Sequence, residues 1–323
     1  MKLRLCAAAF MAAALAASSS LADDGQPATD QAQIARAKAL LASLHPQHGD
    51  VAVPAAHATL HLGERYYFLG PDDARKVLID GWGNPPDATQ GVLGMVFPAG
   101  RSPLGDTWGA VVTYLDEGYV PDADARTTNY NDLLQRMRKA QEDDDADRVK
   151  RNEPQIHLVG WAQPPSYDGA RHALIWARDL KFDDAKRDTL NYDIRELGRH
   201  GVLSLNMVST MDMLPQVRAA AGDLGAAAGF EPGQRYEDYQ KGVDKRAAYG
   251  VAGLIAAGAG LALAQKAGLV ALVFLFLKKG AVVLVAGFAA LANRFKGLFR
   301  RRDKTLQAPR PGEWPDRRPP GGP

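Results

Sequence analysis

The sequence predicts an α+β domain with a mainly antiparallel sheet and flanking helices, followed by a C-terminal transmembrane helical anchor. Three observations support this: short apolar runs separated by Gly- and Pro-rich turns, a few separate stretches with helical spacing, and an apolar segment at residues 247–292. Strands and helices that are segregated along a chain are typical of the α+β class. A predominantly apolar stretch of about 20 residues is long enough to cross a bilayer.

Residues 1–22 are typical of a cleaved secretory signal peptide. Two basic residues precede an apolar run at residues 5–17, and small residues continue to Ala22, where cleavage is expected. A retained first helix is the alternative, although the apolar run is short for a membrane span. The one cysteine, Cys6, lies in this segment. The mature chain would therefore lack disulfides, thiol catalysis and cysteine-based zinc sites.

Residues 23–50 are expected to form an N-terminal linker that contains a helix. Ala, Leu, Lys and Arg recur at helical spacing over residues 31–44, and the turn formers Pro46 and Gly49 follow. The pattern then changes to alternation of apolar and polar residues at residues 51–69. This change predicts a β-hairpin directly after the linker.

The predicted α+β domain occupies residues 51–240. A helix is expected from Pro71, where a proline and two acids suit the first turn, to Gly81. Further helices are expected at residues 130–137 and 213–224. Alternating or apolar runs predict six further strands, at residues 91–97, 108–115, 155–161, 173–182, 190–197 and 202–208.

Turn-forming residues between these strands predict two long hairpins. Pro164, Pro165 and residues 167–169 are expected to connect the first pair of strands, and residues 198–201 the second pair. In the second hairpin apolar and polar residues largely alternate. This alternation predicts that one face of the hairpin covers a core while the other meets water.

The charges are distributed unevenly along the chain. Residues 23–240 contain 22 Lys and Arg against 33 Asp and Glu, whereas residues 241–323 contain 15 against 4. A nucleic-acid-binding protein would carry its basic residues on the folded domain, so no nucleic acid is expected as a partner. A basic tail suits the anionic cytoplasmic leaflet of a membrane. We therefore expect residues 293–323 to be a basic and then proline-rich disordered tail.

The apolar segment allows three membrane topologies. A single crossing within residues 250–277 places only Lys266 deep in the bilayer, with the lysine pair at 278 and 279 as a stop signal. A hairpin of residues 247–264 and 267–292, or one span at 267–292, buries that pair instead. A central lysine costs about 2.5–3.5 kcal/mol on insertion scales, and this cost and the positive-inside rule favour the single crossing. The hairpin remains the alternative.

The histidines are the main candidates for chemistry. His57 and His61 would share one face if both lay on one strand, but the four ligands of a structural zinc site are not apparent. His157, His172 and His200 lie at expected strands or turns near acids, and they are the candidates for a hydrolase or a metal-dependent enzyme. Because catalytic groups are recognised by geometry, the sequence assigns no catalytic, cofactor-binding or metal-binding residue.

Several distinctive strings occur in a fixed order. They are Gly81–Pro86, Val159–Tyr167, Thr189–Tyr192, Gly198–Asn206 and Tyr249-Gly250 before the apolar segment. Together they resemble DUF2167, a bacterial membrane-anchored family of unknown function, over roughly Tyr66 to Arg302. The resemblance implies a periplasm-facing domain and a C-terminal membrane anchor. It implies no catalytic residue, because none is established for the family.

These observations favour a membrane-anchored envelope protein that acts as a non-enzymatic binding or assembly module. We expect it at the inner membrane, with the main domain exported to the periplasm and no cofactor. Its expected partners are the membrane and either another protein or a second copy, since Gly253, Gly258 and Gly260 would allow close helix packing. A periplasmic hydrolase or metal-dependent enzyme is the alternative. Carriage of a lipid or small ligand by the sheet would require a large apolar cavity.

Overall fold

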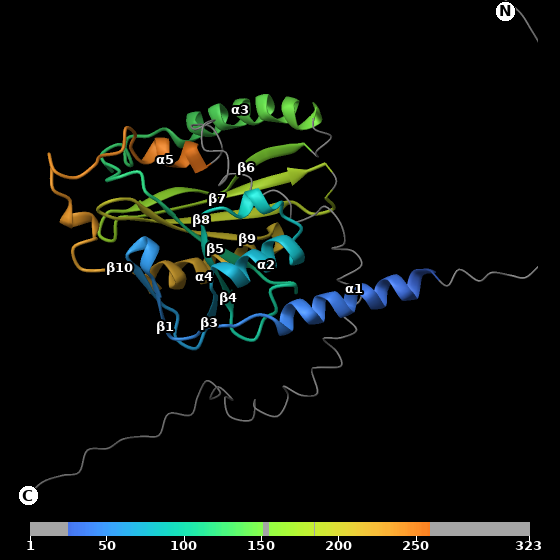
Figure 1. Ribbon diagram of the computed structural model, residues 1–323. Coiled ribbons are helices and arrows are strands. Elements are labelled where there is room, and N and C mark those ends of the chain that lie inside the picture. The colour runs from blue at the N-terminus through green and yellow to red at the C-terminus, as the bar shows by residue number, and fades with distance from the viewer. Residues whose placement is uncertain (1–24, 151–154, 184, 259–323) are drawn as a thin grey trace, which may run out of the picture.

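A large antiparallel sheet runs through the computed structural model, which describes residues 25–150, 155–183 and 185–258 (Figure 1). Its strands are β3 (Tyr66–Leu69), β4 (Val92–Pro98), β5 (Gly109–Leu115), β6 (Ile156–Asp168), β7 (Ala173–Phe182), β8 (Thr189–Leu197) and β9 (Val202–Thr210). They form one seven-stranded sheet in the order β3-β4-β5-β9-β8-β7-β6. The six further strands expected from the sequence are thus all present, and the mainly antiparallel sheet is confirmed.

A second, three-stranded sheet is formed by β1 (Asp50–Val53), β2 (Ala58–His61) and β10 (Ala228–Phe230) in the order β1-β2-β10. The hairpin predicted at residues 51–69 is therefore only partly correct. Its first two strands pair with each other, with Val51 opposite Leu60, whereas β3 pairs with β4 in the large sheet. All four residues of β3 are buried, because Tyr66 and Phe68 pack with the small sheet on one face and Tyr67 and Leu69 pack with residues 74–82 on the other.

The first of the described helices extends away from the large sheet, and the others cover both of its faces (Figure 1). The helices are α1 (Gly25–Ala42), α2 (Pro71–Lys76) with a π-helical turn (Val77–Gly81), α3 (Tyr130–Lys150), α4 (Leu214–Ala227) and α5 (Val251–Gly258). Short 3-10 turns lie at Pro54–Ala56, Pro86–Thr89, Met211–Met213 and Tyr236–Asp238. One face packs against α4 and the small sheet. The other packs against α2 at one end and against α3 and α5 at the other. The α+β class is confirmed.

Strand β8 differs from the sequence-based expectation. All nine of its residues are buried, and β9 is nearly as well covered, so the predicted water-facing side of this hairpin is wrong. The turn itself is confirmed, because Thr189 of β8 lies opposite Thr210 of β9. Since both strands lie in the middle of the sheet, their polar residues face a covered surface. In these strands the alternation separates a buried apolar face from a buried polar face.

The predicted connection at Pro164 and Pro165 is also wrong. Both prolines lie within β6, and the strand continues to Asp168 before it turns at residues 169–172. An edge strand tolerates proline because its outer side needs no backbone N–H for pairing. The register between β6 and β7 shifts between Gln163 and Ser166, which accommodates the two rings. The hairpin is therefore confirmed, but it is longer than predicted.

Helix α5 joins the folded domain to the segment predicted as an anchor. Val251, Leu254 and Ile255 are buried in one cluster with residues of α3. Asp124 accepts hydrogen bonds from the backbone N–H groups of Val251 at 2.9 Å and Ala252 at 3.0 Å, and this negative charge suits the start of a helix. The beginning of the 247–292 segment thus belongs to the core of the domain.

Among residues 25–150, 155–183 and 185–258, no helix combines the length and the apolar character that a membrane crossing requires. The predicted signal peptide at 1–22, the remainder of the predicted anchor at 259–292 and the predicted tail at 293–323 lie outside the described residues.

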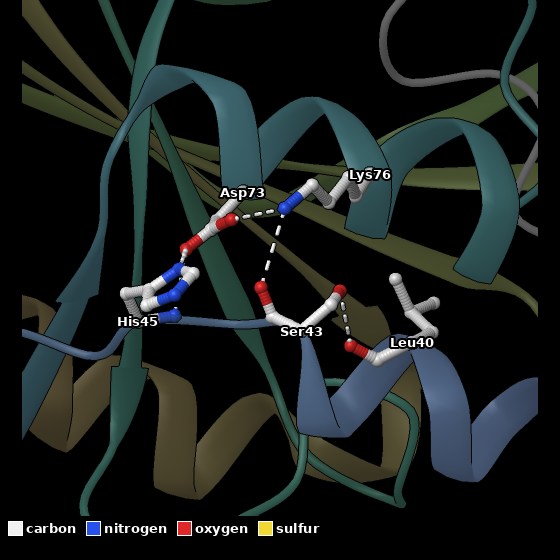
Figure 2. A network of polar contacts seen from close by, with 5 residues as sticks. All are labelled: Leu40, Ser43, His45, Asp73 and Lys76. Carbon is white, nitrogen blue, oxygen red and sulfur yellow. Dashed lines mark hydrogen bonds and ion pairs between the residues drawn. The ribbon is translucent and has the colours of Figure 1, made fainter.

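The N-terminal helix is attached to the domain through a buried carboxylate (Figure 2). Asp73 of α2 accepts hydrogen bonds from the His45 backbone N–H at 2.6 Å and from Lys76 Nζ at 2.7 Å, and Lys76 also donates to the carbonyl of Ser43. Burial opposes ionisation of Asp73, but the hydrogen bonds from Lys76 and His45 hold its pKa below the ordinary value. The helix predicted at residues 31–44 is confirmed, and its C-terminal end is fixed against α2.

Candidate functional site

Four chain segments meet at one end of the large sheet, at the left of Figure 1. They are the loop at 116–129, the β6–β7 turn at 169–172, the β8–β9 turn at 198–201 and the segment at 231–249. Backbone hydrogen bonds connect them: Gly118 N–H donates to the His200 carbonyl at 2.9 Å, and Tyr119 N–H to the Lys245 carbonyl at 3.0 Å. We call this region the loop end.

Stacked aromatic rings occupy the centre of the loop end. The ring of Tyr236 lies 4.2 Å from the imidazole of His172 and 4.4 Å from the ring of Tyr119, measured between centroids. Tyr119 in turn stacks on Tyr239 at 3.9 Å. Such offset stacking adds about 0.5–1.5 kcal/mol per pair beyond the area that is buried. The stack therefore holds three of the four segments in one arrangement.

Hydrogen bonds extend this stack to an acid. The Tyr167 hydroxyl donates to Asp122 Oδ2 at 2.6 Å and lies 3.0 Å from His172 Nδ1. Because the phenolic hydrogen points to the carboxylate, the same oxygen accepts from Nδ1–H of His172, and this fixes the histidine tautomer. We call these residues together the tyrosine cluster: Tyr119, Asp122, Tyr167, His172, Tyr236 and Tyr239.

Two phenols of this cluster, those of Tyr167 and Tyr236, remain protonated at neutral pH. Burial, followed by the hydrogen bond to Asp122, raises the pKa of Tyr167 well above the ordinary value of 10.0. Burial likewise raises the pKa of Tyr236, whose hydroxyl donates to the Val120 carbonyl at 3.0 Å. Neither phenol is therefore suited to act as a base or as a nucleophile. Their chemistry is that of hydrogen-bond donors with apolar rings.

Two cavities adjoin the tyrosine cluster, and both are lined in part by the β6–β7 turn. The first has a volume of about 510 Å³, and its lining includes Arg171, His172, Glu196, Phe230 and Tyr236. The second has a volume of about 530 Å³, and its lining includes Asp122, Arg126, Tyr167 and Asp168. Ala170 lines both. The hydrogen-bonded series Asp122–Tyr167–His172 thus runs from one cavity to the other.

Glu196 is the most perturbed acid in the wall of the first cavity. Its side chain is 7% exposed and lies 3.1 Å from Arg171, measured between Oε1 and Nη2. Burial raises the pKa of Glu196 to about 7, against the opposing charge of Arg171 and with a smaller contribution from Asp168. The first cavity therefore has an acid that gains or loses its proton near neutral pH.

The structure does not bring the three candidate histidines together. His157 lies opposite Lys181 at the far end of the β6–β7 hairpin, where its Nε2 is 2.9 Å from Asp183, while His172 lies in the turn at the other end. His200 lies in the neighbouring β8–β9 turn. Of the three, only His172 lines one of these cavities, and it lines the first but not the second.

His57 and His61 do not lie on one strand, so the condition under which they would share a face is not met. His57 has a left-handed backbone with φ of 49° and ends the 3-10 turn before β2, so it is not part of the strand. His61 lies in β2, with its Nδ1 2.9 Å from Asp50. Within the described part of the chain, no group of three or more His, Cys, Asp or Glu side chains is arranged to hold a metal ion.

Sequence reasoning did not identify Glu196 and Tyr167. One signal for Glu196 was present: Arg195 and Glu196 are consecutive charges in a strand, so one of them must point to each face of the sheet. In a strand covered on both sides, each charge then requires its own partner. No comparable signal exists for Tyr167, because its partners Asp122 and His172 lie 45 and 5 residues away in the sequence.

The fold and site define an α+β protein with a polar, aromatic loop end, and sequence comparison supplies its family. The model of the family described as Protein of unknown function (DUF2167) matches residues 45–289, so the chain belongs to that family. No curated protein matches significantly. Among solved structures, that of cyanobacterial PsbP (CyanoP) from Synechocystis sp. PCC 6803 is similar at 9% identity and a TM-score of 0.32, covering 59% of this chain and 94% of that chain. A TM-score of 0.32 does not establish that the two proteins share a fold.

Proposed function

We propose that this chain is a membrane-anchored envelope protein whose domain is a non-enzymatic binding module, facing the periplasm and held at the inner membrane. The secretory pattern of residues 1–22, the apolar segment at 247–292 and the acidic domain followed by a basic tail support this location. The observation that carries the binding role is the pair of cavities lined by residues of the tyrosine cluster.

The composition of the loop end suits a protein partner. Tyrosine and arginine are enriched at protein interfaces, since they combine a large contact area with a polar group. The rim of the first cavity has exposed charges of both signs, including Arg171, Glu231 and Glu237. A lipid carrier would instead need an apolar cavity. The charged linings of both cavities therefore favour a polar protein surface as the occupant.

The packing of α5 supports a position of the loop end close to the membrane. Asp124 in the loop at 116–129 holds the start of α5, and α5 leads directly to the apolar residues predicted to anchor the chain. Because Val251 and Ile255 are buried in the domain, we propose that the crossing starts beyond α5. Residues 259–277 would still be long enough for a single crossing that stops at Lys278, because a helix rises about 1.5 Å per residue.

Site-specific photo-crosslinking in cells tests the binding role. A photoreactive residue at Glu231, on the rim of the first cavity, is expected to form an adduct with a second protein. The same residue at Glu142, another exposed glutamate, on α3, serves as the matched control. Adducts are recovered from detergent extracts and identified by mass spectrometry. Recovery of only the uncrosslinked chain from the Glu231 variant would contradict the proposal.

The enzymatic alternative depends on two residues of the first cavity, His172 and Glu196. A periplasmic hydrolase built on His157, His172 and His200 would require at least two of these side chains in one cavity, and only His172 lines a described one. The first cavity does contain Glu196, with its pKa near 7, as a possible acid or base beside His172. If the purified full chain cleaves ester or peptide substrates and Glu196→Gln abolishes this activity, the chain is an enzyme and the proposal of a non-enzymatic binding module is wrong.

A further inference from the structure

A second polar cluster lies in the middle of the large sheet, and none of its residues lines the two cavities of the loop end. Trp176 and Arg178 of β7 lie opposite Asp193 and Asn191 of β8, so their side chains share the face that α3 and α5 cover at one end. Trp176 and Asp193 have no exposed surface, and Arg178 and Arg195 are 4% and 8% exposed. We call Trp176, Arg178, Asp193 and Arg195 the arginine cluster.

Asp193 is the centre of this cluster. Its Oδ1 lies 2.8 Å from Nη2 of Arg195, and its Oδ2 lies 3.3 Å from Nη2 of Arg178. The amide of Asn206 donates to Oδ1 as well, at 2.9 Å. The guanidinium of Arg195 lies over the indole of Trp176, with Cζ 5.4 Å from the ring centroid. Both arginines and the indole therefore lie close to one carboxylate.

The cluster contains more positive charges than negative charges, and more N–H donors than nearby acceptors. Two guanidinium groups share one carboxylate, which leaves an excess of one buried positive charge. Three buried N–H donors have no hydrogen-bond partner among the described residues: Nε1 of Trp176, Nε of Arg178 and Nε of Arg195. Each such donor loses the hydrogen bond that water would provide, and an unpaired buried charge is more destabilising still. An acceptor with negative charge would remove both deficits.

We propose that the arginine cluster binds one small oxyanion, such as phosphate, sulfate or a carboxylate group. An oxyanion presents several acceptor oxygens and at least one negative charge, which matches both arginines and the indole N–H. Water would supply acceptors but no charge. This site is separate from the cavities of the loop end, and it does not depend on the function proposed for them.

The pKa of Arg178 is lowered, which agrees with a missing negative charge beside it. Burial, opposed by Asp193, lowers the pKa of Arg178 below its ordinary value, and the like charge of Arg195 lowers it further. Three neighbours on the same face of β8 and β9, Asn191, Asn206 and Ser204, are uncharged. The phenol of Tyr249 also lies near the cluster: burial raises its pKa to about 12 against the charge of Arg195, so it too is neutral. Arg195, the more exposed of the two arginines, is the side chain from which an ion would reach the cluster.

Calorimetric titration of the purified full chain in maltoside detergent tests this site. Sodium phosphate, sulfate and acetate are compared with sodium chloride at equal ionic strength, and thermal unfolding is followed in parallel. We expect saturable binding of at least one oxyanion and a higher melting temperature in its presence. The three ions distinguish a phosphate or sulfate site from a carboxylate site. If no oxyanion binds saturably up to tens of millimolar, the proposal is wrong.

Three variants locate the binding. Trp176→Phe removes one N–H and keeps a buried ring, and it should weaken oxyanion affinity about three- to tenfold. Arg195→Met should abolish binding. Arg187→Met, at an exposed arginine paired with Asp212, is the control and should bind as the wild type does. If Arg195→Met fails to fold, Trp176→Phe decides the question. Equal affinity in Trp176→Phe and the wild type would place any bound ion elsewhere and overturn the assignment.

Discussion

The tyrosine cluster and the arginine cluster both contain buried polar side chains, but they differ in how many of these groups have a hydrogen-bond partner. In the first, Tyr167 is matched by Asp122 and His172, and the Tyr236 hydroxyl by a backbone carbonyl. In the second, three N–H donors remain unmatched. Loops supply side chains from several directions, whereas neighbouring strands in fixed register supply them only along the sheet. Groups in the middle of a sheet therefore depend more on a partner from outside.

The largest expected effect is the loss of the acid in the arginine cluster. Asp193→Ala leaves two buried guanidinium groups without a counter-charge, and it should lower the free energy of unfolding by about 3–5 kcal/mol. Urea unfolding of the full chain in detergent measures this. Asp212→Ala breaks an ion pair whose side chains are 53% and 57% exposed, and this control should change stability by at most about 1 kcal/mol. A similar loss in both variants would mean that burial does not distinguish the two pairs.

The second prediction concerns pH and Glu196, beside the tyrosine cluster. The folded state raises its pKa from 4.5 to about 7, so folding favours the protonated form. Its contribution to stability is full below pH 4.5 and is lost as the pH rises through 7. Glu196→Gln stays neutral, and its stability relative to the wild type should therefore rise by about 3 kcal/mol across this range.

Urea unfolding at a series of pH values measures this difference. Glu231→Gln, at an exposed position on the rim of the same cavity, is the control and should keep the wild-type pH profile. A parallel profile for Glu196→Gln and the wild type would show that Arg171 compensates fully for the burial of the acid. The first cavity would then not change charge near neutral pH.

A glycine beneath the tyrosine cluster provides the third prediction. Gly118 has φ of +82°, and a β-carbon there would lie 2.6 Å from the Lys245 carbonyl oxygen. Gly233 has φ of +84° but nothing within 4 Å of such an atom. Both Gly→Ala variants introduce backbone strain of about 1 kcal/mol, and Gly118→Ala should lose roughly a further 1–2 kcal/mol through the clash. Equal melting temperatures would mean that the 116–129 loop can move away from Lys245.

The smallest effect is expected from Tyr167→Phe. The variant removes the hydroxyl that joins Asp122 to His172 and keeps the ring, so it should cost about 1 kcal/mol. Thermal unfolding measures the loss, and the imidazole resonances of His172 should shift in the NMR spectrum. Tyr130→Phe, which removes a hydroxyl bonded to the Ala125 carbonyl, is the control and should leave those resonances in place. Unchanged resonances in Tyr167→Phe would show that the hydroxyl does not determine the histidine tautomer.

Local patterns predicted most of the elements but not their surroundings. The helix at Pro71, the β8–β9 hairpin and the strands β4 and β5 follow from turn chemistry and periodicity, which act over a few residues. The prolines at 164 and 165 were misread as a connection because proline excludes only central strand positions, and the sequence does not say which strand is at the edge. The same limit applies to β8, since alternation cannot tell a solvated face from a covered polar one.

The sequence by itself determined the class of the fold, the order of the strands along the chain and the family resemblance, because these depend on periodicity and on short strings. Only the tertiary structure decided which polar residues meet. Tyr167 finds Asp122, Arg178 finds Asp193, and Val251 packs with α3 rather than standing apart from the domain. The physical reason is that hydrogen bonds and ion pairs depend on distances of a few ångströms, and the sheet order that sets those distances joins segments far apart in the chain.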